Sequence, residues 1–503
     1  MLELVVCVDV GSTFTKAVLV DVDAGRLLGT AQHPTTLPDV MTGITAARDE
    51  LAAAVEAGTD AGWISQSASG KSVPDDVADP KGVAGPDGVA GPDGVAGPQR
   101  PAHAEPSPGS LSADEVRAAD LLACSSAGGG LRLAVVGHER LVTAEAGQRV
   151  ALSAGGRVVH LSSGRLTPDG VRELREARPD LIVLTGGTDG GNADVVLHNA
   201  RRIGIARIPV PVVLACNRDA AEEAAGELRR RGRSVTVTAN VLPSIGTFDP
   251  GPAREAIREA FLDHVIGGKG LSRKGSRING RSFRQLVRSP TPDAVLTGVE
   301  ALAEGRGLLL VDVGGATTDV YSVLPADKAG SGAAAAGDWL SARTVEGDLG
   351  VRSGALGVVR AALAEVLIDD EEAQRLRDYA SGLIVAGELA PAHELDVMLA
   401  RLAVLVAVRR HGRASRPGGD PRPLRDVGLV VGSGGVLRHA REGELTGVLK
   451  PIVADHAGGW AVPEKAGLAV DARYALFAAG LLQGRADPGA VRRLAAAGLE
   501  QLP

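Results

Sequence analysis

The sequence predicts an α/β protein of two lobes, with a parallel α/β module inserted into the first lobe. Two short apolar strands, at 2–9 and 307–312, each end in aspartate and lead into a glycine turn followed by hydroxyl residues. Between them, apolar strands alternate with amphipathic helices, which is typical of a parallel sheet covered by helices. We therefore expect a first lobe at 1–165, an inserted module with linker helices at 166–304, and a second lobe at 305–503.

The first lobe is expected to open with an antiparallel meander, because its short apolar segments are separated by turn residues. A Gly-, Pro- and Ser-rich stretch at 66–110 then repeats Gly82–Asp87 at Gly88–Asp93. It lacks glycine at every third position and cannot bury a core, so we expect a disordered surface insert, not collagen. A tolerated loop expansion and a functional tether both fit this insert. The expected elements of the lobe are strands 2–9, 16–22 and 27–31, helix 39–57, helix 112–122, glycine turn 125–130, strand 131–137, helix 144–154 and strand 157–161.

The module is expected to repeat a helix and a strand three times before two linker helices lead to the second lobe. The final helix, at 471–482, is apolar on one face and should pack across a sheet. The elements between are helix 168–178, strand 181–185, helix 193–204, strand 210–216, helix 218–231, strand 234–239, and linker helices 252–265 and 293–304.

Two of the glycine turns have the composition of phosphate-binding loops. Glycine at such a turn lets backbone N–H groups close on phosphate oxygens. The aspartate that precedes each turn cannot itself attract phosphate, so its expected role is to hold hydrated Mg²⁺. A plain hairpin turn is the alternative for either loop alone. The first loop contains Asp9, Gly11, Ser12, Thr13 and Lys16, and the second contains Asp312, Gly314, Gly315, Thr317 and Thr318.

With the third turn, Gly432–Gly435, these loops resemble the superfamily of actin, DnaK-type chaperones and sugar kinases. The resemblance implies an actin-like ATPase fold of duplicated ribonuclease H-like lobes, with ATP or ADP in the cleft. The stretches Cys124–Leu131, Leu184–Asn192 and Glu346–Gly350 resemble the MutL (GlmL) family, which is unrelated to the mismatch-repair protein of that name. This second resemblance covers nearly the whole chain apart from the insert.

Members of that family accompany adenosylcobalamin-dependent glutamate mutase and related aminomutases. The resemblance therefore implies a chaperone-like ATPase whose partner is such a mutase. The resemblance to the wider superfamily implies that Asp312 orients the attacking water, and Asp9 is expected to be the second catalytic and Mg²⁺-binding carboxylate. Gly347 and Gly350 would close over the nucleotide, and Gly432, Gly434 and Gly435 would leave a flat surface for adenine and ribose.

Several polar features have more than one interpretation. Lys16 could reach the β-phosphate as a point charge or could be a solvated strand-end lysine. The run Gly186–Asn192 could bind an anion at a helix N-terminus, or Asn192 could cap that helix. Between His264 and Asp293 there is no acidic residue but many basic ones, which fits a solvated loop or a docking surface for an acidic partner. These basic residues are Lys269, Arg273, Lys274, Arg277, Arg281, Arg284 and Arg288.

Composition excludes several classes of function. The net charge of −7 gives no reason to expect nucleic acid or an anionic membrane as partner. Three widely separated cysteines and histidines without H-x-x-x-H spacing predict no disulfide framework, zinc site or iron–sulfur cluster. The D-x-H-x-x-G motif of cobalamin-binding subunits is absent, so we expect no directly bound cobalamin. Met1 leads straight into a strand and no apolar run is long enough for a bilayer, so we expect a cytoplasmic protein.

Two other functions remain open at this point. A small-molecule kinase of the same fold would need a catalytic base facing a substrate pocket, and no motif places one. An actin-like assembly protein would use ATP only to control polymerisation. Nucleotide turnover with and without mutase, and sedimentation with ATP, would separate these possibilities.

Overall fold

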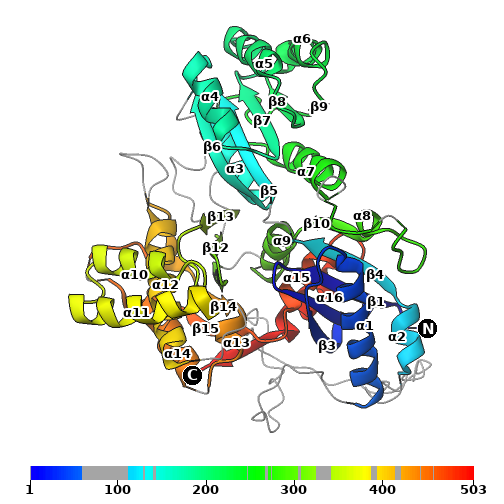
Figure 1. The fold of residues 1–503 in the computed structure, drawn as a ribbon, viewed down its shortest axis with the longest axis vertical. Coiled ribbons are helices and arrows are strands. Elements are labelled where there is room, and N and C mark those ends of the chain that lie inside the picture. The colour runs from blue at the N-terminus through cyan, green and yellow to red at the C-terminus, as the bar shows by residue number, and fades with distance from the viewer. Residues whose placement is uncertain are drawn as a thin grey trace, which may run out of the picture.

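The computed structural model describes residues 2–58, 111–127, 131–139, 143–245, 247–266, 270–273, 275–303, 307–324, 341–386, 393–413, 421–441, 443–456 and 458–503. Within these ranges the chain forms two lobes side by side and a separate module standing above them (Figure 1). The insert predicted at 66–110 lies outside the described residues.

The first lobe is built on a five-stranded mixed sheet in the order β10-β4-β1-β2-β3. Its antiparallel meander and its parallel strands are buried on both faces, which is why they read as nearly continuous Val, Leu and Ala. One face is covered by α1 (Val40–Glu56) and α2 (Ala113–Ala118). The strands are β1 (Leu4–Val10), β2 (Phe14–Asp21), β3 (Arg26–Pro34), β4 (Asp120–Ser125) and β10 (Val287–Pro290).

The second lobe repeats this plan in a six-stranded sheet of order β13-β12-β11-β14-β15-β16. In both lobes a central strand pairs antiparallel with the next strand and parallel with a later one. The predicted duplication of an actin-like lobe is therefore confirmed. The strands are β11 (Leu308–Val313), β12 (Thr318–Val323), β13 (Ser341–Glu346), β14 (Leu429–Ser433), β15 (Gly467–Asp471) and β16 (Leu499–Leu502).

Helices cover the outer face of the second sheet and form one apolar core with it. The longest, α12, begins at a capping box in which His393 accepts from the Leu395 N–H. These helices are α10 (Ala355–Ala364), α11 (Asp370–Ala386), α12 (Glu394–Gly412), α13 (Gly435–Arg438) and α14 (Glu444–Leu449), with short 3₁₀ turns at Leu424–Asp426 and Lys450–Ala454.

Two helices, α9 (Thr291–Ala303) and α15 (Ala475–Leu482), cross between the lobes and share one core with the inner faces of both sheets. They touch backbone to backbone: a Cβ at Gly298 would lie 1.9 Å from the Leu476 carbonyl oxygen. Likewise, a Cβ at Gly480 would lie 1.8 Å from the Ala294 carbonyl oxygen. Because α15 is buried nearly all round, it is not the one-sided helix predicted at 471–482. Next to it packs α16 (Pro488–Ala497).

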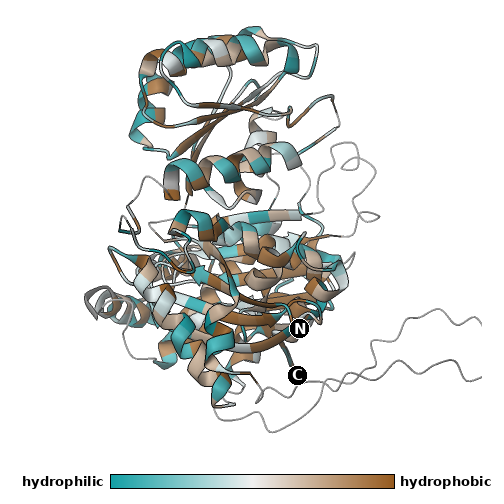
Figure 2. Cartoon of the chain, turned by 90° about the vertical axis from the view of Figure 1, so that its right-hand side faces the viewer, coloured by the Kyte–Doolittle hydropathy of each residue, from teal (hydrophilic) through white to brown (hydrophobic). Residues whose placement is uncertain are grey.

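The module is a five-stranded, wholly parallel sheet in the order β6-β5-β7-β8-β9. Figure 2 shows its hydrophobic strands enclosed by helices of mixed hydropathy. The strands are β5 (Leu131–Gly137), β6 (Gly156–Ser163), β7 (Leu181–Gly186), β8 (Val212–Cys216) and β9 (Val235–Val237). The helices are α3 (Thr143–Ser153), α4 (Pro168–Glu176), α5 (Asp194–Ala206), α6 (Arg218–Arg229) and α7 (Gly251–Ala260).

The module begins earlier than the predicted boundary at 165/166. The sequence predicts strands 131–137 and 157–161 in the first lobe, but β5 and β6 pair with each other, and β5 pairs with β7, in the separate sheet. After α7, a π-helical turn at Phe261–Ile266 and the short α8 (Phe283–Leu286) return the chain to the first lobe. In the described ranges, no helix combines the length and the apolar character needed to cross a membrane.

Candidate functional site

The two predicted phosphate loops have the same backbone geometry. The N–H of Gly11 donates to the Phe14 carbonyl at 3.0 Å, and the N–H of Gly314 donates to the Thr317 carbonyl at 2.9 Å. A Cβ at Gly11 would lie 2.7 Å from that Phe14 oxygen, so a larger residue would force the turn open. The equivalent Cβ at Gly314 would lie 2.9 Å from the Thr317 oxygen. Both turns thus require glycine for close backbone approach.

Asp9 lies on the inner face of the first sheet, between Lys16 on β2 and Cys124 on β4. Its carboxylate is buried, and both of its oxygens have partners. The Lys16 Nζ lies 3.1 Å from Asp9 Oδ2, and the Thr291 hydroxyl donates to Oδ1 at 2.5 Å. The Cys124 thiol also lies 3.7 Å from Oδ1, and burial together with the Asp9 charge raises the pKa of that thiol. Asp9 therefore already neutralises the Lys16 cation.

Asp312 occupies the equivalent place in the second lobe, between Asp319 on β12 and Ser433 on β14. Among the described residues, none makes a hydrogen bond or ion pair with its carboxylate. Mg²⁺ in phosphate-binding sites keeps several waters and needs only one or two carboxylates, so the free Asp312 oxygens fit a hydrated ion. The described ranges contain no cluster of three or more His, Cys, Asp or Glu side chains suited to a protein-bound metal. Of the two predicted metal and catalytic aspartates, Asp312 is the better placed.

Lys16 extends from the first lobe to the second. Its Nζ lies 4.4 Å from the centre of the Tyr474 ring, and 21% of its side chain is exposed. Burial lowers the pKa of Lys16, but Tyr474, Asp9 and Asp312 together outweigh burial and hold the pKa above its usual value. The side chain is thus a fixed cation between the lobes and not a solvated strand-end lysine.

The three glycines of the third turn differ in their surroundings. Gly434 has φ of 112°, and a Cβ there would lie 2.1 Å from the Val313 carbonyl, so the turn crosses directly over the end of β11. A Cβ at Gly432 would meet the Leu437 and Leu449 side chains within 2.9 Å. A Cβ at Gly435 would meet no neighbour within 4 Å. Only Gly435 therefore presents open backbone of the kind predicted for adenine and ribose.

Sequence reasoning missed a cation and an aromatic ring beside this turn. Arg438 is buried, and its Nε donates to the Asp471 carbonyl at 2.8 Å while Nη2 donates to Ser433 Oγ at 3.1 Å. Its guanidinium carbon lies 2.8 Å from the centre of the Tyr474 ring, which is thus contacted by both Lys16 and Arg438. Tyr474 itself has φ of 52°, a left-handed conformation that is uncommon for a bulky residue. Arg438 could have been found from the sequence, because it follows the glycines of the third turn closely. No feature of the sequence pointed to Tyr474.

The segment around Gly347 and Gly350 packs against the second phosphate loop. A Cβ at Gly350 would lie 2.2 Å from the Ala316 carbonyl carbon, and the Val351 N–H donates to the Gly314 carbonyl at 3.0 Å. The buried Thr318 hydroxyl donates to the Leu349 carbonyl at 2.5 Å. Thr318 therefore supports the loop from beneath and does not present its hydroxyl to the cleft as predicted.

The remaining loop residues are at least partly exposed. Ser12 is exposed, and Thr13, Gly315 and Thr317 are partly exposed. Gly347 is exposed and faces the module, since the nearest atom to a Cβ there would be Arg157 Nη1 at 3.6 Å.

The glycine run at the end of β7 forms a tight turn held by buried amides. Asn217 accepts from the Gly190 N–H and donates to the Gly191 carbonyl, and Asn240 donates to the Gly187 carbonyl. The side chain of Asn192 accepts from the Asp194 N–H at 2.9 Å. The glycines therefore form the tight turn of the second alternative, but Asn192 is not the cap, because the N-cap of α5 is Ala193, which makes no side-chain capping hydrogen bond.

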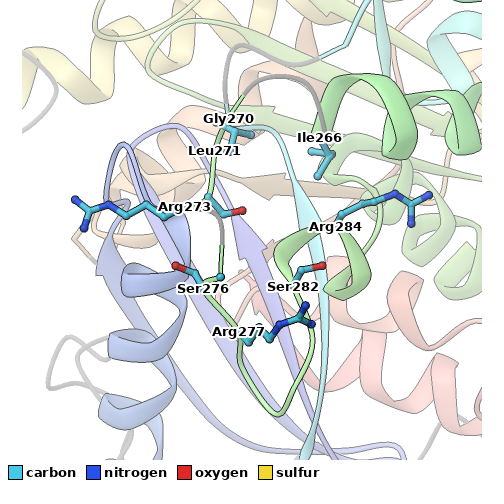
Figure 3. Close-up of a pocket in the computed structure, with 10 residues that line it drawn as sticks. Ile266, Gly270, Leu271, Arg273, Ser276, Arg277, Ser282 and Arg284 are labelled. Carbon is cyan, nitrogen blue, oxygen red and sulfur yellow. The ribbon is translucent and has the colours of Figure 1, made fainter.

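The basic segment surrounds a cavity of about 240 Å³ lined by residues from Ile266 to Arg284. Figure 3 shows the Arg273 and Arg284 side chains pointing away from it on opposite sides. Arg284 pairs with Asp263, and Arg281 pairs with Asp120 at 2.5 Å. These three guanidinium groups therefore do not converge on the cavity. Lys269 and Lys274 lie outside the described residues, and a docking role for this segment stays a prediction.

A family model described as MutL protein matches residues 5–498. Protein MutL of Clostridium tetanomorphum is 31% identical over 513 residues, covering 96% of each chain. A nucleotide-free acetone carboxylase structure is 13% identical with a TM-score of 0.34, covering 96% of this chain and 70% of that one. A ROK hexokinase from Thermus thermophilus is 13% identical with a TM-score of 0.22, covering 92% of both chains. The match along nearly its whole length places this chain in the MutL protein family.

Proposed function

We propose that this protein binds Mg-ATP and Mg-ADP between its lobes and hydrolyses ATP slowly in the service of a partner protein. The observation that carries the proposal is the pair of matching loops, one in each lobe, with the Lys16 cation beside the Tyr474 ring of the opposite lobe. Two lobes that carry matching glycine turns at equivalent strand ends are suited to bind one phosphate chain from both sides.

The contacts that each side chain makes in the structure suggest its role. Lys16 supplies a point charge for the β-phosphate, and the exposed N–H groups around Ser12 and Gly315 supply donors. Asp312 holds Mg²⁺ through water and orients the attacking water, since its carboxylate has no other described partner. Asp9 acts mainly by fixing Lys16 through the contact at 3.1 Å. The open backbone at Gly435 receives the adenosine.

The partner we propose is an adenosylcobalamin-dependent mutase such as glutamate mutase, which the protein would reactivate or protect. Membership of the MutL family supports this choice, and the absence of D-x-H-x-x-G leaves the corrinoid with the partner. ATP and ADP would stabilise different closures of the two lobes, and a partner that contacts both lobes must favour one closure. By linkage, the partner then changes nucleotide affinity by the same factor as nucleotide changes partner affinity.

The test is to mix the protein with mutase that was inactivated during turnover, and then to add ATP, Mg²⁺ and fresh adenosylcobalamin. We expect recovery of mutase activity that requires ATP, is lost in Asp312→Ala and persists in Asp23→Ala, which changes an exposed aspartate in a turn. Flat activity with no detectable complex would instead favour a small-molecule kinase. ATP-dependent sedimentation of the protein alone would favour an assembly protein.

A further inference from the structure

Arg343 of the second lobe contacts the inserted module. Arg343 on β13 is only 5% exposed, and its Nη1 donates to the carbonyls of Leu152 and Gly156, each at 3.4 Å. Leu152 is in the last turn of α3 and Gly156 opens β6. A cation is favoured at a helix C-terminus, where carbonyl groups lack partners within the helix. Arg343 thus closes the end of α3 from the other domain.

The same guanidinium reaches toward the nucleotide cleft. Its Nη2 lies 3.1 Å from Asp319 Oδ1, and its carbon lies 5.5 Å from the centre of the Tyr321 ring. Asp319 is directly opposite Asp312 in the β11–β12 pairing, so their side chains share one face of the sheet. Burial raises the pKa of Asp319; Arg343 opposes the rise and Asp312 adds to it. A charge that arrives at Asp312 therefore also acts on the Asp319–Arg343 ion pair.

The other end of α3 lies at the distal edge of the module. There the Thr143 hydroxyl accepts the N–H groups of His138 and Glu139 at 2.8 and 2.9 Å, and Thr185 donates to the Thr143 carbonyl at 2.9 Å. The strand order reverses between β5 and β7, and the crevice at such a reversal is where open α/β sheets receive ligands. One helix therefore joins this edge to the arginine that faces the cleft.

We propose that Arg343 is a positioning residue that couples the nucleotide cleft to the inserted module, so that nucleotide at Asp312 changes how firmly α3 is held. This inference rests on the proposed binding of nucleotide. Mg²⁺ and phosphate alter the charge beside Asp319, and the ion pair either tightens or releases the guanidinium. Because the same guanidinium holds the Leu152 carbonyl of α3 and the Gly156 carbonyl of β6, these two elements of the module respond together.

Hydrogen exchange of the full chain tests the coupling, read on peptides that cover 143–153 with and without Mg-ADP. In the wild type we expect ADP to change exchange rates there by roughly fivefold or more, the low end of usual site-to-site couplings. Arg343→Lys should abolish the change while ADP still binds, because an ammonium cannot span the carboxylate and both carbonyls. The matched control is Arg132→Lys: Arg132 lies within the module and donates to the Ala177 carbonyl, so the response should remain.

A second variant covers the case in which Arg343→Lys folds poorly. Asp319→Asn keeps the arginine on α3 but weakens its link to Asp312, and it should also lose the response. Calorimetric binding of ADP is measured on every sample. If wild-type chain binds ADP but exchange at 143–153 does not change, the coupling is overturned and the proposed function stands. If wild-type chain binds no nucleotide, both are overturned.

Discussion

The Lys16 ammonium of the first lobe lies 4.4 Å from the centre of the Tyr474 ring in the second lobe. The lobes thus meet through a cation on an aromatic face. Lys16 is also within 3.1 Å of Asp9, so its charge is held without any bound anion. A phosphate that binds between the lobes would meet a cation that is already held in place. Binding would therefore cost little side-chain conformational entropy.

Replacing this cation should weaken binding of the phosphates but not of adenosine. A hydrogen bond to a charged group contributes about 1.5–3 kcal/mol, so Lys16→Met should raise the Kd for Mg-ADP by roughly tenfold to a hundredfold. Lys450→Met, at an exposed lysine, is the matched control. Titration calorimetry with ADP and with adenosine checks the prediction, and equal weakening of both ligands would argue against a phosphate contact.

The two aspartates should respond differently to substitution. Asp312→Ala should lower ATP turnover by about a hundredfold or more but weaken ADP binding much less, since orienting water matters mainly in the transition state. Its Tm should change little, because the carboxylate has no described hydrogen-bond partner. Asp9→Ala should lower the Tm, since Lys16 and Thr291 would lose their acceptor. Equal losses of turnover and ADP affinity in Asp312→Ala would mean that this residue only anchors the metal.

The crossing of α9 and α15 predicts a large difference between two glycine substitutions. Gly480→Ala places a methyl group where the Ala294 carbonyl lies 1.8 Å away, and overpacking of this kind costs about 1–3 kcal/mol or more. Gly382→Ala in α11 meets no atom within 4 Å and should stabilise the helix by up to about 1 kcal/mol. Chemical unfolding measures both. A well-tolerated Gly480→Ala would show that the helices do not touch in solution.

His411 should make stability depend on pH. It is fully buried between the hydroxyls of Thr344 and Ser322, each at 2.9 Å, and burial lowers its pKa well below 6.5. Below about pH 6.5 the unfolded chain therefore gains a proton that the folded chain does not, so the unfolding free energy falls as pH falls. The contribution is about 1.4 kcal/mol per pH unit, and it disappears above that range. The unfolding free energy, measured from pH 7 to pH 5, should depend less on pH in His411→Gln than in wild type. The exposed-site control His456→Gln should behave like wild type.

Local sequence patterns predicted the parts of the site that depend on local geometry. Glycines at Gly11, Gly314 and Gly434 mark turns in which backbone approaches backbone, and such turns can be recognised from a few adjacent residues. Tyr474, Thr291 and Arg343 could not be found this way. Their contacts join segments that are hundreds of residues apart in sequence. Such contacts cannot be predicted from the residue type or from the spacing along the chain.

The predicted boundary of the module was wrong for a related reason. The apolar strands β5 and β6 look the same whether they join the first sheet or a new one, because buried parallel strands carry no sign of their partners. Similarly, Thr318 matched the hydroxyl pattern of a phosphate loop, but its place in the buried alternation of β12 turned its side chain toward Leu349. The hydroxyl of Thr318 fitted the predicted loop, but the orientation of its side chain depended on the tertiary fold.

Titration calorimetry of the purified full chain with Mg-ADP tests the central claim most directly. We predict binding of one nucleotide per chain, weakened at least tenfold in Lys16→Met and nearly unchanged in Lys450→Met. The absence of heat with both Mg-ADP and Mg-ATP, in a chain shown to be folded, would contradict a nucleotide cleft between Asp9 and Asp312.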